Sequence, residues 1–310
     1  MIILDGAMGT ELTRRGINTT LPLWSAQALM DAPDVIEQIH RDYIAAGAHV
    51  ITANTFRTNV RTMQRAGIAD GGRALTHKAV ALAKSACRRE IGDRRLGSEA
   101  QSPFSNLPSP RIAGSMAPVE DCYSPELVPS DDELREEHGV LARNLAEAGC
   151  DLILVETMNC IRETVIAAQA AASTGLPVWV SFTLNAHNDL LSDEMLRDAV
   201  KAILPFHPEA MLVNCIPVLQ VASALASLRD AMHLEGASHL GIGAYGNVGH
   251  VDDEVGWTLT HAVSPVAYAE AAREWQDLGA TIIGGCCGTL PDHIAALSAL
   301  NNSQAEVIRR

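Results

Sequence analysis

Short aliphatic segments alternate with longer stretches of helical periodicity along the chain, and this alternation constrains the fold more than any other sequence feature. It is typical of strand-helix units that build a parallel sheet. The eight expected strands are residues 2–4, 49–53, 111–114, 151–155, 178–182, 211–214, 240–243 and 281–283. The expected helices between them are residues 33–46, 75–89, 131–148, 162–173, 194–203, 220–232 and 265–278.

Eight parallel strands favour closure into a barrel over an open sheet. An open doubly wound sheet more often has a G-x-G-x-x-G phosphate loop after its first strand, and no such motif follows residues 2–4. We find no internal repeat or domain boundary, and α/β barrels commonly form a single unit of this size. We therefore predict a single-domain α/β protein, a (β/α)8 TIM barrel over residues 1–310, with an exposed loop at residues 92–110.

Charge and composition narrow the class of ligand. The formal net charge of −14 argues against nucleic-acid binding, which needs clustered Lys and Arg to displace counterions. There is no basic segment leading into a long apolar stretch and no run of about 18 apolar residues, so we expect neither secretion nor membrane insertion. Seven cysteines is an odd number for a disulfide framework, which favours reduced thiols. We predict a cytoplasmic protein that acts on small molecules, and the sequence leaves its oligomeric state open.

Three cysteines fall at the carboxyl ends of expected strands, where barrel enzymes place their chemistry. Cys215 ends the sixth strand, while Cys286 and Cys287 follow the eighth. Neighbouring side chains in a strand point to opposite faces, so this pair can share one metal ion only if the backbone leaves strand geometry. The glycines at positions 284, 285 and 288 make such a departure possible.

Three converging thiolates with a fourth position open suit catalytic zinc, and the chain lacks the paired C-x2–4-C elements of a structural zinc site. The alternative is that these cysteines are small buried residues, and we assign burial or chance to the remaining ones, at positions 87, 122, 150 and 160. Two functions of another class stay open: a thiol redox protein and a non-catalytic zinc-binding protein. A barrel aldolase would need a strand-end lysine, but the lysines at 78, 84 and 201 fall in expected helices.

Several motifs resemble the homocysteine S-methyltransferase family of zinc-dependent barrel enzymes over nearly the whole chain. They are DGAMGTEL at 5–12, LWSA at 23–26, HRDYIAAGA at 40–48, ITANTF at 51–56, GSMAP at 114–118, VETM at 155–158, VNC at 213–215 and GGCCGT at 284–289. The last two look like the zinc motif of the family. The resemblance implies one zinc ion per chain, with Cys215, Cys286 and Cys287 as its ligands.

The resemblance also implies roles for residues around the metal. Asp5 and Glu156 match the acids that bind the ammonium group of homocysteine, and the alternative for both is a solvated loop carboxylate or a residue at a helix N-terminus. Trp24 can lie against a sulfonium through a cation–π contact, or it can be a core or lid residue. Asn54 and Ser115 can hydrogen-bond the substrate or line the pocket, and each can equally be a turn residue.

Family members differ in their methyl donor, and this chain looks most like the branch that uses S-methylmethionine or S-adenosylmethionine. In the betaine-using branch a tyrosine follows the second strand, whereas Phe56 stands at the matching position here. We therefore expect a sulfonium donor and homocysteine as acceptor, giving methionine. Betaine as donor, or another thiol or a selenol as acceptor, stays an alternative because fold and metal do not determine the substrate.

Overall fold

The computed structural model describes residues 1–310 apart from 69, 71, 97–108, 253–255, 259–263 and 309–310. Its main sheet has eight parallel strands in the order β1-β10-β7-β6-β5-β4-β3-β2. These strands are β1 (Ile2–Ile3), β2 (Val50–Ala53), β3 (Arg111–Met116), β4 (Leu152–Met158), β5 (Val178–Phe182), β6 (Ala210–Pro217), β7 (Gly241–Asn247) and β10 (Ile282–Gly285).

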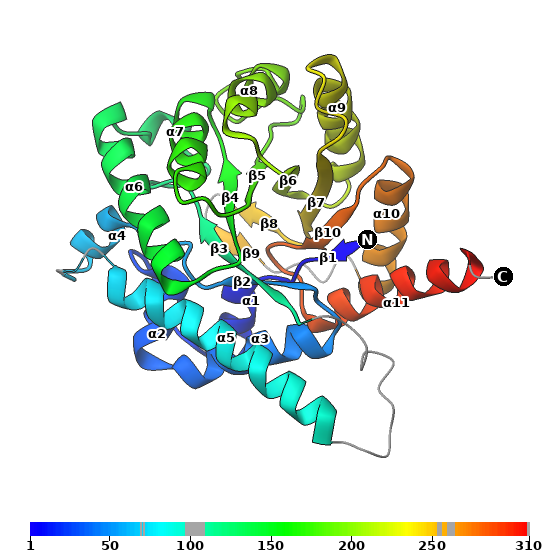
Figure 1. Ribbon diagram of the computed structural model, residues 1–310, viewed down its shortest axis with the longest axis horizontal. Helices are drawn as coiled ribbons and strands as arrows, with labels where there is room; N and C mark the ends of the chain where they lie inside the picture. Colours follow the sequence, from blue (N-terminus) through cyan, green and yellow to red (C-terminus); the bar gives the residue numbers. More distant parts are fainter. Residues whose placement is uncertain (69, 71, 97–108, 253–255, 259–263, 309–310) are drawn as a thin grey trace.

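The first and last strands of this order meet and close the barrel. Leu4 forms a parallel bridge with Val50. Beside it, the Asp5 amide donates to the Val50 carbonyl at 3.0 Å and the His49 amide donates to the Ile3 carbonyl at 2.7 Å. The predicted single-domain (β/α)8 barrel is therefore confirmed (Figure 1).

Helices surround the barrel in Figure 1, which follows from the crossover that each pair of parallel strands requires. Their bounds are α1 (Met8–Arg14), α2 (Ala28–Asp31), α3 (Pro33–Ala45), α4 (Val60–Arg65), α5 (Arg73–Leu96), α6 (Asp131–Ala148), α7 (Ile161–Ala172), α8 (Leu196–Ile203), α9 (Val221–Leu234), α10 (Pro265–Asp277) and α11 (Pro291–Ile308). Short 3-10 turns are η1 (Trp24–Gln27), η2 (Pro125–Leu127) and η3 (Leu204–Phe206). Within the described residues, no helix has the length and apolarity needed to span a bilayer.

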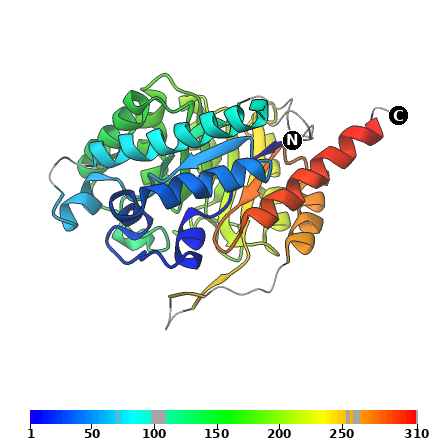
Figure 2. The ribbon, with the colours of Figure 1, turned by 90° about the horizontal axis from the view of Figure 1, so that it is seen from below.

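Two segments differ from the sequence prediction. The start of the predicted loop at 92–110 is helical, because α5 continues to Leu96. Residues 88–96 are mostly good helix formers, and one internal glycine costs a helix only about 1 kcal/mol. Positions 97–108 of that loop lie outside the described residues. After β7, the chain forms an unpredicted antiparallel pair, β8 (His250–Asp252) and β9 (Gly256–Thr258), which extends away from the barrel in Figure 2.

Alternation along the strands separates two apolar layers and also positions the polar site. Ile153 and Val155 belong to the large core between the sheet and the helices. Leu152 and Leu154 belong to a smaller cluster inside the barrel. Because successive side chains of a strand face opposite sides, Glu156 is the next inward position of β4. The inner cluster consists of Leu4, Val50, Ala113, Leu152, Leu154, Trp179, Ala210, Leu212, Tyr245 and Ile282.

Candidate metal centre

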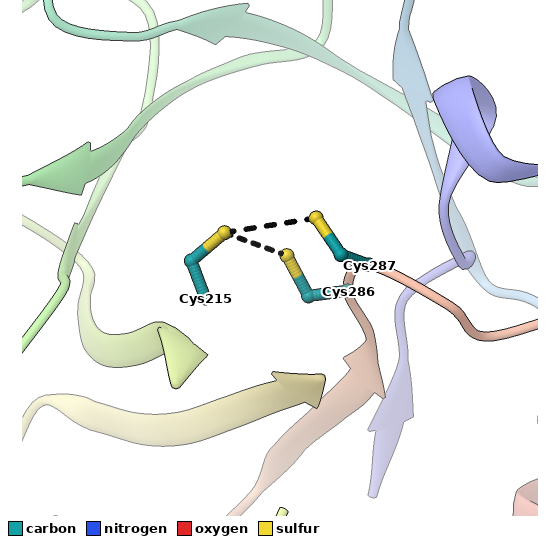
Figure 3. A group of neighbouring side chains, drawn as sticks. All are labelled: Cys215, Cys286 and Cys287. Carbon is teal, nitrogen blue, oxygen red and sulfur yellow. Dashed lines mark hydrogen bonds between the residues drawn. The ribbon is translucent and has the colours of Figure 1, made fainter. Parts of the chain in front are cut away.

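The sulfur atoms of Cys215, Cys286 and Cys287 converge at the carboxyl end of the barrel, and all lie within 4.8 Å of one another (Figure 3). The Cys215 sulfur is 3.3 Å from that of Cys286 and 3.9 Å from that of Cys287. The three cysteines come from two strand ends that are about 70 positions apart in the sequence. This group can hold a metal ion, since each sulfur offers one ligand atom to a common centre.

A change of backbone conformation aims Cys215 at this centre. Leu212 faces the barrel interior, and Asn214 shares its face of β6, so regular alternation would turn Cys215 outward. Instead Cys215 has φ 58°, in the left-handed region, and the pairing of β6 with β7 shifts register between Asn214 and Pro217. The left-handed residue breaks the alternation and brings the sulfur to the mouth of the barrel.

Cys286 and Cys287 reach the centre because the chain leaves strand geometry at Gly285, as predicted. The Cys286 carbonyl accepts from the Thr289 amide at 3.0 Å and from its hydroxyl at 2.7 Å, which forms a tight turn. Gly288 in this turn has φ 83°, a conformation that costs other residues about 1 kcal/mol or more. The Cys287 amide donates to the side chain of Asn247 at 3.1 Å, which ties the turn to β7.

The pKa values of the three thiols differ. Hydrogen bonds from Cys286 and Cys287 lower the pKa of the Cys215 thiol to about 6, so this sulfur is the first to become a thiolate. The hydrogen bonds that Cys286 and Cys287 donate to Cys215 raise the pKa of both thiols well above the ordinary value, and burial and the charge of Cys215 add to this effect. A thiolate with two thiol donors therefore exists at neutral pH, and full ligation of a metal ion would displace the remaining two protons.

Asp5 lies at the closure of the barrel and is buried. Its two carboxylate oxygens accept from the Thr52 amide at 2.8 Å and from the Thr52 hydroxyl at 2.9 Å. Burial raises the pKa of Asp5 to about 8, against these hydrogen bonds, and the carboxylate of Glu156 raises it further. A buried carboxylate with such partners favours the approach of a cation.

Glu156 is held by neutral donors from two other strands. The Ser115 hydroxyl, from β3, donates to one carboxylate oxygen, and the Tyr245 hydroxyl, from β7, donates to the other at 3.0 Å. Burial raises the pKa of Glu156 to about 7, and the nearby Cys286 adds to this effect. The carboxylate therefore lies inside the barrel mouth and close to the sulfur centre, as the inward register of β4 requires.

Comparisons with known proteins identify the group to which this chain belongs. A family model described as homocysteine S-methyltransferase matches residues 2–300. The chain belongs to this family. Homocysteine S-methyltransferase YbgG of Bacillus subtilis is 32% identical and aligns over 96% of this chain and 94% of its own length. The homocysteine S-methyltransferase of Escherichia coli is 33% identical over the same shares.

A solved structure of the family has the same architecture. The metallated form of the homocysteine methyltransferase MmuM from Escherichia coli superposes with a TM-score of 0.80 at 28% identity, and the match covers 96% of each chain. The family resemblance drawn from the motifs is thus confirmed for sequence and fold together.

Within this family member, the segment that follows α1 packs closely on the barrel mouth. The Ser25 hydroxyl donates to the Asn54 side-chain oxygen at 2.7 Å, and the Asn54 amide group donates to the Ser25 carbonyl at 2.9 Å. The Trp24 ring meets Phe56 edge to face at 5.6 Å, and a Cβ atom on Gly9 would come within 2.4 Å of it. Asn54 therefore holds the segment to the barrel through Ser25, and Trp24 packs against Phe56 and Gly9. Contact of either with substrate stays a prediction.

The structure adds residues that sequence reasoning missed. Tyr245 continues the inward register of β7, but the predicted strand ended two residues before it. The Tyr123 hydroxyl, in the loop between β3 and α6, donates to the Cys215 sulfur at 3.2 Å. Only the position of this tyrosine, in a loop after a strand end, could have suggested it. Burial of the four other cysteines, which was predicted as one explanation for them, is confirmed.

Proposed function

We propose that this protein transfers a methyl group from a sulfonium donor, S-methylmethionine or S-adenosylmethionine, to the thiol of homocysteine, giving methionine. The proposal assigns one zinc ion per chain to Cys215, Cys286 and Cys287. The observation that carries it is the convergence of three sulfur atoms within 4.8 Å beside two buried carboxylates. The names of the family and of its similar members agree with this chemistry.

The donor set fits zinc. Thiolate sulfur is a soft ligand, and three such ligands with room for an exchangeable fourth are the pattern of a catalytic zinc site. Zinc, when bound, supplies a positive charge that favours the thiolate form of a coordinated substrate thiol, which otherwise has a pKa near 8.5. Three protein thiolates offset that charge, so a substrate sulfur held beside them stays electron-rich.

Asp5 and Glu156 have the chemistry to bind the ammonium group of an amino acid. Within the described part of the chain, the hydrogen-bond partners of both carboxylates are neutral: Thr52, Ser115 and Tyr245. Each carboxylate is destabilised by burial, and a bound ammonium group would restore its charge through a short ion pair. We propose that these acids place the thiol end of the substrate at the cysteine centre.

The absence of a hydroxyl group at Phe56 supports the sulfonium donor over betaine. Phe56 follows β2, where the betaine-using branch has a tyrosine hydroxyl, and its ring contacts Trp24 edge to face. Aromatic rings attract cations, and the loss of the donor's positive charge during transfer is favoured in an apolar environment. Both points hold for a sulfonium and for the quaternary ammonium of betaine, so the choice between the donors rests on the missing hydroxyl at Phe56. The experiment distinguishes betaine as donor, and a different thiol or a selenol as acceptor stays the alternative if homocysteine gives no turnover.

The test joins metal analysis with turnover. Reduced protein is analysed for its metal content, and methionine formation from homocysteine is measured separately with S-methylmethionine, S-adenosylmethionine and betaine. We expect about one zinc per chain and turnover with a sulfonium. If zinc is bound but no donor supports turnover, either homocysteine as acceptor or the sulfonium as donor is rejected. Absence of zinc would reject the proposal and favour the thiol redox alternative.

A further inference from the structure

The loop that leads from β3 to α6 is attached to the barrel at several points before it reaches Tyr123. The Val119 amide donates to the buried carboxylate of Glu163 at 2.8 Å. The Glu120 carboxylate pairs with both terminal nitrogens of the Arg65 guanidinium, at 2.6 and 2.7 Å, and with Arg61 at 2.8 Å. Two α4 arginines on one buried carboxylate hold it more firmly than a single surface pair would.

Backbone carbonyls of the same loop provide two more attachments. Arg57 donates to the Glu120 carbonyl at 3.1 Å, and the Asn159 amide group donates to the Cys122 carbonyl, also at 3.1 Å. Asn159 follows β4, and Arg57 follows β2, so the loop is joined to both neighbours of β3. The position of Tyr123, the next residue, is therefore determined by the surrounding barrel.

Tyr123 uses this position to contact one sulfur of the centre. Its ring is partly exposed, with 38% of the residue accessible, while its hydroxyl lies 3.2 Å from the Cys215 sulfur. Cys215 is also the sulfur that Cys286 contacts at 3.3 Å and Cys287 at 3.9 Å. The neighbouring Ser124 hydroxyl instead bonds Asp121 at the surface, at 3.1 Å.

A hydrogen bond to a thiolate withdraws electron density from sulfur and weakens it as a nucleophile. In a methyltransferase of this kind the substrate thiolate must react, and the protein thiolates beside it must not. We propose that Tyr123 is a specificity-determining residue of the centre: its hydroxyl, held by the attachment of Glu120 to Arg61 and Arg65, protects Cys215 from alkylation. This inference rests on the proposed function, because it takes the three cysteines as the ligands of a metal ion.

The test measures alkylation of the zinc-loaded protein by iodoacetamide. In that reaction the cysteine sulfur forms a bond to carbon, and iodide leaves with the electron pair of the carbon–iodine bond. Mass mapping gives separate rates for Cys215, Cys286 and Cys287 in the wild type and in Tyr123→Phe. The phenyl ring keeps access to the centre unchanged. We expect alkylation of Cys215 to be about tenfold faster in the variant, the effect of one hydrogen bond to a charged group.

Two further variants separate protection from a general loosening. Ser124→Ala, a matched hydroxyl deletion, should leave all three rates unchanged. Glu120→Gln alone should raise the rate of Cys215 alkylation. Added to Tyr123→Phe, it should raise that rate little further, since both substitutions act through the Tyr123 hydroxyl. Equal Cys215 rates in wild type and Tyr123→Phe, with zinc retained in both, would overturn the inference and leave the metal site intact. A wild type that binds no zinc would instead reject the proposed function, and the inference with it.

Discussion

Asn214 accepts a hydrogen bond from the Thr157 amide at 3.0 Å and donates one to the Thr157 hydroxyl at 2.8 Å. Thr157, which follows Glu156, has φ 59°, and Cys215, which follows Asn214, has φ 58°. β4 and β6 therefore each contain one residue in the left-handed conformation, and in both strands it lies at a shift in register. One buried side chain joins the two irregular strand ends that position the acid and the sulfur.

Asn214→Ala should weaken both the fold and the metal centre. It removes two hydrogen bonds to Thr157 and a third, at 2.7 Å, from the Ser181 hydroxyl. We expect a loss of about 2–4 kcal/mol in the free energy of unfolding and weaker zinc binding, because Cys215 loses the neighbour that supports its backbone. Denaturant unfolding and chelator competition measure these two effects. Ser181→Ala removes only one of the three bonds to Asn214 and leaves the two with Thr157, so an equal loss of zinc affinity in that control would contradict the argument.

Cys286→Ala should abolish zinc retention while the barrel stays folded, because Cys286 is only partly buried and packs at the edge of the inner apolar cluster. Elemental analysis and circular dichroism check the two parts of this prediction. Cys87→Ala is the matched control, since Cys87 is buried within α5. Zinc near one equivalent in Cys286→Ala would remove this cysteine from the ligand set.

Zinc affinity should increase with pH. At neutral pH Cys215, with a pKa of about 6, is already a thiolate, whereas Cys286 and Cys287 have raised pKa values and keep their protons. Binding then releases two protons, so the dissociation constant should fall by about 100-fold per pH unit above pH 7. Chelator competition at several pH values gives this slope. A slope near zero would mean that the thiols are already ionised.

Glu156→Gln should raise the KM for homocysteine at least about tenfold, the effect of losing one charged hydrogen bond, while zinc content stays unchanged. Glutamine keeps an oxygen for the Ser115 hydroxyl, so the substitution removes charge with little change of shape. Steady-state kinetics with varied homocysteine are the measurement. An unchanged KM would exclude the carboxylate as the partner of the ammonium group.

Asp5→Asn should make thermal stability less dependent on pH. The pKa of Asp5 is about 8 in the folded protein and near 3.8 in the unfolded chain, so between these values the folded state holds a proton that the unfolded state releases. Stability from this group is full below about pH 4 and falls as pH rises towards 8. Asparagine can keep both contacts with Thr52. At pH 9 we expect the free energy of unfolding of the variant to exceed that of the wild type by at least about 1 kcal/mol. If the melting temperatures of the two proteins change in parallel from pH 5 to 9, the raised pKa is contradicted.

The amino-acid sequence by itself determined the barrel and the candidate metal ligands. Strand alternation and helix periodicity are local patterns that predict where each strand ends. Because barrel enzymes have their active sites at the carboxyl ends of the strands, these patterns also predict the site. Cys215 and the pair at 286 and 287 could therefore be placed at one mouth without a structure. The extension of α5 was missed because the Gly92 region resembles a loop in composition, although one glycine does not end a helix.

Only the tertiary structure decided how the site is arranged. The contact of Tyr123 with Cys215 joins residues 92 positions apart, and that of Tyr245 with Glu156 joins residues 89 apart. Such pairs depend on which loop is held across the barrel mouth and on strand register, and neither has a local signature in the chain. The left-handed backbone at Cys215 is likewise stabilised by neighbours distant in sequence, because a non-glycine residue adopts it only where surrounding contacts offset its cost.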